Sequence, residues 1–181
     1  MRAIDLRECH RLLLDIATLI DRVCRQHGIP YYMLGGTMLG AVRHGGFIPW
    51  DDDIDLGIPR AHFDRLARLL DDALRDTPYR LHTYHNSPNK INYLKVVDTR
   101  TCIHGAWETT DTGINIDLFP LDCGPRLNLL TRPFASYIYL LLLIKDYKRL
   151  NASPRRGLKR LIAATLKRLP FRTDTLIAHI D

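Results

Sequence analysis

The chain has 181 residues, a length that fits one domain better than several. Hydrophobic residues make up 46% and charged residues 25% of the sequence, which excludes a disordered chain, a collagen-like chain and a coiled coil. No apolar run reaches the roughly 18 residues that a membrane-spanning helix needs. The N-terminus carries acids at Asp5 and Glu8 and does not look like a signal peptide, so we expect a cytoplasmic protein.

The net charge of +6 is unevenly distributed along the chain. Residues 1–144 hold 16 basic and 17 acidic residues, whereas residues 145–181 hold 10 basic and 3 acidic residues. The high isoelectric point therefore belongs to the C-terminal segment. Such a segment suits phosphate-rich partners, whether anionic lipid or nucleic acid.

Hydrophobic periodicity predicts eight elements before a helical C-terminal segment. In chain order they are a helix over 4–27, a strand over 31–34, a helix over 37–44, a strand over 54–58, a helix over 61–75, and strands over 80–84, 93–97 and 113–119. Thr37 is expected near the N-cap of the second helix. This order predicts an α+β fold in which a small mixed β-sheet is flanked by helices, with a core over 1–132 and a helical basic segment over 133–181.

An acidic cluster is the most informative feature of the sequence. Four aspartates fall within five positions, at Asp51, Asp52, Asp53 and Asp55. Packed carboxylates repel one another unless a cation or solvent offsets their charge. In a strand, the alternation Asp53-Ile54-Asp55-Leu56 puts both carboxylates on one face, where they can share Mg²⁺. The alternative, a solvated acidic turn, would leave Ile54 and Leu56 exposed.

Two other binding sites are excluded by residue spacing. A calcium loop that starts at Asp51 would need glycine and glutamate where the sequence has Leu56 and His62. The glycine-rich stretch over 35–46 contains no Gly-Lys-Ser/Thr, so it is not a P-loop. It does place Gly35-Gly36-Thr37 between a predicted strand and a helix, where backbone N–H groups favour a phosphate.

A third carboxylate is expected from a neighbouring strand. Asp117 stands in the apolar strand over 113–119, with Asn115 on the same face. A lone aspartate in such a strand is costly unless it is paired or binds metal. Asp98 and Asp122 are alternatives, but both look like turn residues, so Asp117 is the predicted third ligand.

Together these residues resemble a known family. Leu34-Gly35-Gly36, Asp53-Ile54-Asp55-Leu56 and Ile116-Asp117-Leu118 match the pattern of the polymerase-β-like nucleotidyltransferase superfamily. The longer string GGTMLGAVRHGGFIPWDDDIDLGIPR closely resembles the signature of the LicD family, the bacterial phosphocholine transferases related to fukutin and fukutin-related protein. The resemblance spans roughly residues 4–122. LicD-like proteins usually carry a further C-terminal region that nothing here matches, so we expect a truncated form.

The resemblance implies a reaction. The protein would transfer a phospho-alcohol, such as phosphocholine or ribitol phosphate, from a CDP-linked donor to a glycan or lipid-linked glycan hydroxyl and release CMP. Asp53, Asp55 and Asp117 would be catalytic and would hold Mg²⁺, with Mn²⁺ as the alternative. A nucleotidyltransferase that attaches a whole nucleotide remains open, as does a non-enzymatic module that binds anionic lipid or RNA. If the protein is such a transferase, we expect no nucleic-acid partner.

Further residues are candidates for substrate binding: Gly35, Gly36, Thr37, Arg43, His44, Trp50 and Lys95. Lys95 lies in a central apolar strand and is expected to neutralise a donor phosphate. Arg43 and His44 follow the Gly-Gly turn and are expected to reach the pyrophosphate. The Trp50 side chain is expected to line one side of the nucleotide-binding pocket. For each of these side chains, an ordinary surface or packing role is the alternative.

The C-terminal segment predicts a membrane contact. The run from Phe134 to Ile144 has eleven residues, too few to span a membrane but apolar enough to lie in its interface. Ten basic residues follow it, which favours peripheral docking on an anionic membrane. The alternative is a core helix with a solvated basic face.

Overall fold

The structure is a computed structural model that describes residues 3–87, 91–103 and 113–123. The chain divides into two compact units, Met1–Asp122 and Cys123–Asp181, and the first contains all the elements below. The predicted boundary at residue 132 and the predicted helical and basic segment over 133–181 lie outside the described residues. In the described part of the chain, no helix combines the length and apolar character needed to cross a membrane.

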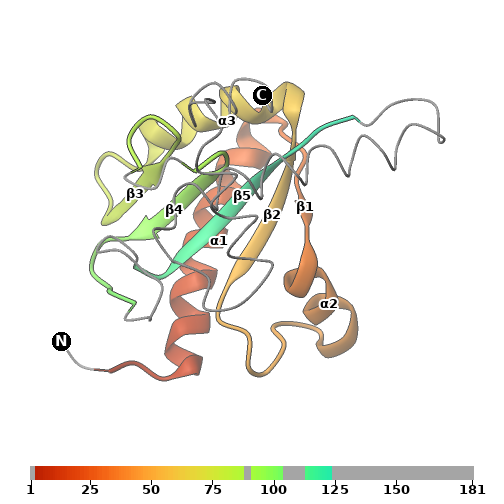
Figure 1. The fold of residues 1–181 in the computed structure, drawn as a ribbon, viewed down its shortest axis with the longest axis vertical. Helices are drawn as coiled ribbons and strands as arrows, with labels where there is room; N and C mark the ends of the chain where they lie inside the picture. The colour runs from red at the N-terminus through yellow and green to blue at the C-terminus, as the bar shows by residue number, and fades with distance from the viewer. Residues whose placement is uncertain (1–2, 88–90, 104–112, 124–181) are drawn as a thin grey trace, which may run out of the picture. The chain divides into compact units, whose positions relative to one another are not determined.

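The first unit is an α+β fold, as predicted (Figure 1). Its elements are α1 (Leu6–His27), β1 (Tyr32–Met33), α2 (Gly35–His44), β2 (Ile54–Pro59), α3 (Arg60–Ala73), β3 (Tyr79–His82), β4 (Leu94–Asp98) and β5 (Asn115–Leu121). This order of helices and strands is the one that the periodicity predicts. Most boundaries differ from the prediction by one or two residues.

One mixed sheet joins all five strands in the order β1-β2-β5-β4-β3. β2 and β5 pair in parallel at its centre, and the other three pairs are antiparallel. The central pair joins two segments that are far apart in the sequence, because Ile54 lies opposite Ile116. Parallel neighbours of this kind need a long connection, which here contains α3, β3 and β4.

The long helix α1 has clear start and stop signals. The side chain of Asp5 accepts a hydrogen bond from the Glu8 N–H at 2.8 Å, which satisfies one free donor of the first turn. Gly28 ends the helix in the left-handed conformation with φ of 62°, which glycine adopts without a Cβ clash. Between these caps an apolar stripe is buried, formed by Leu13, Ile16, Ile20, Val23 and Cys24.

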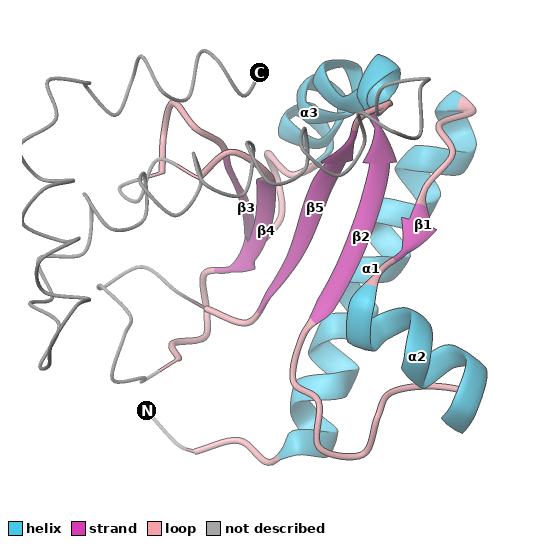
Figure 2. Cartoon of the chain, turned by 45° about the vertical axis from the view of Figure 1, so that its right-hand side comes forward, coloured by secondary structure: helices cyan, strands magenta, loops and turns pink. Residues whose placement is uncertain are grey.

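Helices α1 and α3 pack on one face of the sheet and form the core with it (Figures 1 and 2). The strands contribute alternate residues to that core: Ile54, Leu56, Ile58, Leu81, Leu94, Val96, Ile116 and Leu118. Because strand side chains alternate between faces, the polar residues between them are directed to the opposite face. Helix α2 contacts β2 and lies near its N-terminal end (Figure 2).

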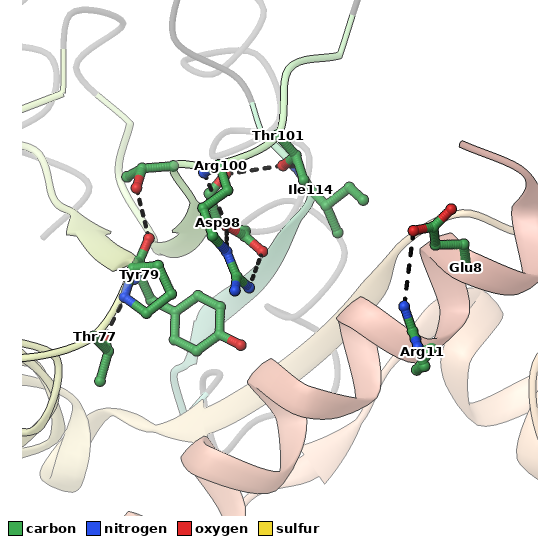
Figure 3. Close-up of polar contacts among 10 residues, drawn as sticks. Glu8, Arg11, Thr77, Tyr79, Asp98, Arg100, Thr101 and Ile114 are labelled. Carbon is green, nitrogen blue, oxygen red and sulfur yellow. Dashed lines mark hydrogen bonds and ion pairs between the residues drawn. The ribbon is translucent and has the colours of Figure 1, made fainter. Parts of the chain in front are cut away.

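A buried ion pair fixes the end of β4. Asp98 is fully buried, and its carboxylate accepts bonds from the Arg100 guanidinium at 2.9 and 2.7 Å and from the Arg100 backbone N–H at 2.9 Å (Figure 3). Burial alone would raise the pKa of Asp98, but these bonds outweigh it and the pKa is lowered. Asp98 therefore stabilises the fold above pH 3.8, its usual pKa, and this stabilisation is lost as the pH falls through the lowered pKa.

We predict that Arg100→Ala lowers the free energy of unfolding by about 2 kcal/mol at neutral pH, because charged hydrogen bonds to a buried carboxylate are lost. The difference from wild type should shrink as the pH falls toward 4, where the unpaired carboxylate becomes protonated. Urea unfolding at several pH values measures both effects. Arg80→Ala is the matched control, since the Arg80 side chain donates to the backbone carbonyls of Thr77 and Tyr79. Equal losses in the two variants would contradict the prediction.

Candidate active site

The central parallel pair brings two of the predicted acids together. Asp55 of β2 and Asp117 of β5 are register partners, so their side chains lie on the same face of the sheet. Each stands between core residues of its own strand that face the other way. The pairing of the two carboxylates thus follows from the strand register.

Asp53 precedes β2 by one residue and joins the same cluster. The predicted alternation is confirmed, because Ile54, Leu56 and Ile58 are 5%, 4% and 0% exposed while Asp53 is exposed. This burial excludes the simple solvated turn, which would expose those aliphatic side chains. The acids Asp51 and Asp52 lie in the loop that leads into the strand.

Lys95, a predicted substrate-binding residue, lies beside Asp117 on this face of the sheet. It is the register partner of Asp117 on the other side of β5, and its Nζ lies 3.2 Å from Asp117 Oδ1. The two side chains are 17% and 18% exposed. The Asn115 side-chain amide also donates to Asp117 Oδ1 at 3.0 Å. Asp117 is therefore held by two donors in a partly buried position.

The three carboxylates share an unfavourable electrostatic environment. Burial, followed by repulsion from Asp117 and Asp51, raises the pKa of Asp55. Partial desolvation of the carboxyl group, followed by repulsion from three neighbouring aspartates, Asp55 first, likewise raises the pKa of Asp53, although the residue as a whole is exposed. Burial also raises the pKa of Asp117, although Lys95 opposes this shift. Carboxylates that mutually raise their pKa values are a common feature of catalytic and metal sites.

The cluster has the chemistry of a divalent cation site. Carboxylate oxygens are hard ligands of the kind that Mg²⁺ and Mn²⁺ prefer, and a cation would offset the repulsion. Among residues 3–87, 91–103 and 113–123, no three His, Cys, Asp or Glu side chains already converge as metal ligands. Asp53, Asp55 and Asp117 are the predicted ligands, and a cation bound by them stays a prediction.

The Gly-Gly turn is tied directly to Asp55. The Leu34 N–H donates to the Asp55 carbonyl at 3.0 Å, and the Asp55 N–H donates to Thr37 Oγ1 at 2.8 Å. The prediction that Thr37 lies near the N-cap is wrong: α2 begins at Gly35, with Leu34 as its N-cap. The Thr37 hydroxyl is used to fasten α2 to β2 instead.

Both glycines of this turn lie against acids. Gly35 has φ of +48°, and a Cβ there would lie 3.5 Å from Asp55 Oδ2. A Cβ on Gly36 would lie 2.5 Å from Asp51 Oδ2, which is too close for a real contact. Gly35 is therefore favoured by its left-handed φ, and a side chain at Gly36 would displace the Asp51 carboxylate.

Arg43, His44 and Trp50 lie further from the turn. Arg43 and His44 are in the last turn of α2, and a rise of about 1.5 Å per residue puts them about 12 Å along the helix from Gly35. Trp50 is 77% exposed, which excludes a core role, and its ring meets His44 edge-on at 6.5 Å. The structure groups Trp50 with His44, and a contact with donor phosphate stays a prediction for Arg43 and His44.

Helix α1 also contributes to the site, which the sequence analysis missed. His10 Nε2 lies 2.6 Å from the Asp51 carbonyl oxygen, and the Cys9 thiol donates to the Asp52 carbonyl at 3.8 Å. Some 40 residues separate the partners, and no local pattern signals such a contact. In the sequence, His10 is only a polar residue of an amphipathic helix. Its role becomes visible when the fold places the acidic loop beside that helix.

The two alternative third acids are engaged elsewhere. Asp98 is paired with Arg100 in the core. Asp122 follows β5 and forms a two-pronged ion pair with Arg60 at 2.7 and 2.8 Å. Neither residue lies on the face that carries Asp55, so Asp117 is the acid that the fold brings to it.

A family comparison matches the part of the chain that contains this site. A family model described as LicD/FKTN/FKRP, nucleotidyltransferase domain, matches residues 28–124. That range contains every candidate residue that the sequence predicted. The family match thus covers β1 through β5 and the whole acidic cluster.

Two named transferases are similar in sequence to this chain. Lipopolysaccharide cholinephosphotransferase LicD of Haemophilus influenzae is 35% identical over 134 residues, covering 70% of this chain and 48% of that protein. Ribitol 5-phosphate transferase FKRP of Homo sapiens is 48% identical over 50 residues, covering 28% of this chain and 10% of that protein. The match therefore spans about half of the first relative and about a tenth of the second.

A solved structure is similar only weakly. A chain from the complex between the type VI effector Tas1 and its immunity protein aligns with a TM-score of 0.38 and 10% identity. The alignment covers 96% of this chain and 94% of that chain. A likeness at this level supports no statement about function.

We predict that Thr37→Val lowers the free energy of unfolding by about 1–2 kcal/mol, because it leaves the Asp55 N–H without its acceptor. Thr37→Ser keeps the hydroxyl and should behave like wild type. Thermal unfolding of the three proteins compares them directly. A Thr37→Ser protein as unstable as Thr37→Val would show that the methyl group, not the hydrogen bond, matters.

We also predict that Asp55→Asn raises the melting temperature at neutral pH when divalent cations are chelated. The raised pKa of Asp55 means that its charged form destabilises the folded state, and this cost disappears as the pH falls below 3.8. The gain should therefore shrink on acidification. Differential scanning fluorimetry across pH tests it, with Asp64→Asn on the exposed side of α3 as the control. A lower melting temperature at neutral pH would contradict the prediction.

Proposed function

Because the chain belongs to the LicD family, we propose that it transfers a phospho-alcohol, such as phosphocholine, from a CDP-activated donor to a glycan hydroxyl and releases CMP. The named relatives are a cholinephosphotransferase and a ribitol 5-phosphate transferase, which supports this reaction class. We also propose that the chain belongs to the polymerase-β-like nucleotidyltransferase superfamily, because its Gly-Gly turn and three acids match that superfamily's pattern.

The observation that carries the proposal is the pairing of Asp55 with Asp117 at the centre of the sheet. Asp53 and Lys95 lie on the same face of the sheet as this pair. Hydrogen bonds from Leu34 and to Thr37 connect the Gly-Gly turn with the backbone of Asp55. A face that combines acids, one lysine and a close backbone turn suits a diphosphate linked to metal ions. A binding module that acts through its basic segment would need none of these features.

The three acids share one role in the proposed reaction, and Asp117 has a second. Asp53 and Asp55 would hold Mg²⁺, or Mn²⁺, against the donor diphosphate, and Asp117 would complete the set. When bound, such ions neutralise the charge that develops on the leaving CMP. The raised pKa of Asp117 suits a group that also accepts the proton of the incoming glycan hydroxyl.

Lys95 and the Gly-Gly turn act on the donor. In this structure the Lys95 ammonium pairs with Asp117. Once Asp117 served as a metal ligand, Lys95 would be available to pair with a donor phosphate oxygen. The lack of side chains at Gly35 and Gly36 would allow the diphosphate to approach the acids closely. Arg43, His44 and Trp50 would contact the outer part of the donor.

A donor panel tests the reaction itself. The protein is incubated with CDP-choline, CDP-ribitol and other CDP-alcohols, Mg²⁺ and a glycan acceptor, and CMP is measured. Release of CMP supports phospho-alcohol transfer. Release of pyrophosphate from a nucleoside triphosphate, without CMP from any CDP-alcohol, would instead show transfer of a whole nucleotide. Chelation should abolish activity, and added Mg²⁺ or Mn²⁺ should restore it.

We predict that Asp117→Asn lowers kcat/KM for CMP release by at least about 100-fold, because it removes a metal ligand and a proton acceptor. Asp122→Asn is the matched control, since Asp122 follows the same strand but pairs with Arg60. It should keep activity close to wild type. A damaging Asp122→Asn together with a silent Asp117→Asn would show that the wrong acid of this strand has been assigned.

A further inference from the structure

The loop that carries the first two acids is fastened by backbone bonds. The Asp51 N–H donates to the Ile48 carbonyl at 3.0 Å, so the loop closes on itself just before the cluster. The carbonyl of Asp51 lies 2.6 Å from His10 Nε2. A carbonyl can only accept, so Nε2 must be the donor and must carry the proton. Both polar groups of the Asp51 backbone are thus occupied.

The imidazole of His10 is itself held in place. It stacks face to face on the Phe47 ring, with centroids 4.0 Å apart and planes that differ by 2°. Phe47 belongs to the same loop as Asp51, so His10 contacts that loop through its ring face and through its ring nitrogen. The neighbouring Cys9 adds a thiol contact to the Asp52 carbonyl. All these bonds run from the first turns of α1 to the loop.

The acidic loop needs such a restraint. Asp51, Asp52, Asp53 and Asp55 fall within five positions, and like charges that lie this close together repel one another. The side chains cannot bond to one another while they are ionised, because a carboxylate is only an acceptor. Bonds to the backbone hold the loop while leaving every carboxylate available.

We infer that His10 is a positioning residue, whose ring N–H holds the backbone of the acidic loop so that Asp53 and Asp55 present their carboxylates to a divalent cation. This rests on the proposed function only in naming the cation. Groups that orient metal ligands typically change metal affinity by roughly 10–100-fold when they are removed. His10 would therefore act through the loop, without touching the donor or the metal.

Two substitutions separate the hydrogen bond from the stacking. His10→Phe keeps a flat ring against Phe47 and removes the donor, whereas His10→Gln can restore an N–H donor to the Asp51 carbonyl. Thr18→Val is the control, because it deletes another side-chain bond to a backbone carbonyl on α1, at 2.7 Å from Leu14 O. Thermal unfolding confirms that each variant is folded.

The first measurement is hydrogen–deuterium exchange of the loop over residues 45–55, with divalent cations chelated. Exchange should rise in His10→Phe and stay near wild type in His10→Gln and Thr18→Val. The second is Mn²⁺ binding followed by electron paramagnetic resonance, where His10→Phe should bind about tenfold more weakly or worse and His10→Gln should recover most of the affinity.

These readouts distinguish the two proposals. Unchanged loop exchange in a folded His10→Phe protein, or a His10→Gln protein as impaired as His10→Phe, would overturn the positioning role. Absence of Mn²⁺ binding in the wild-type protein would count against the proposed metal-dependent transfer, while the exchange measurement would still decide whether His10 holds the loop.

Discussion

Repulsion between carboxylates is the constraint on which the rest of this structure depends. The register of β2 and β5 sets Asp55 beside Asp117, and the chain then adds Asp53, Asp51 and Asp52 at the same end. Among the described residues, one contact offsets this charge and several others hold the backbone against it. Lys95 pairs with Asp117, Thr37 and Leu34 fix the backbone of Asp55, and α1 holds the loop.

The alternating residues of the acidic strand made much of this site predictable. Ile54 and Leu56 had to be buried, so Asp53 and Asp55 had to face the other way, and a second strand with the same alternation supplied Asp117. The glycine-rich signature identified the family. The length and order of the elements followed from periodicity, which depends only on neighbours within a few residues.

Contacts between distant segments were not predictable in the same way. The pairing of Lys95 with Asp117 depends on which strands are neighbours and in what register, and the sequence offers no local sign of either. The contact from His10 depends on how α1 crosses the loop. Thr37 looked like a helix cap because threonine favours that position, but its hydroxyl was taken by a tertiary hydrogen bond to Asp55.

The parallel pairing of β2 with β5 also bears on how the protein folds. Ile54 and Ile116 are register partners although more than sixty positions separate them, so this pair forms only after a long loop closes. The antiparallel pair of β3 and β4 needs a much shorter closure. Non-local pairing is intrinsically slow, so we expect the acids to meet late, in the step that also brings Ile54, Leu56, Ile116 and Leu118 into the core. The like charges are therefore brought together by the step that completes the core, and burial of these aliphatic side chains opposes their repulsion.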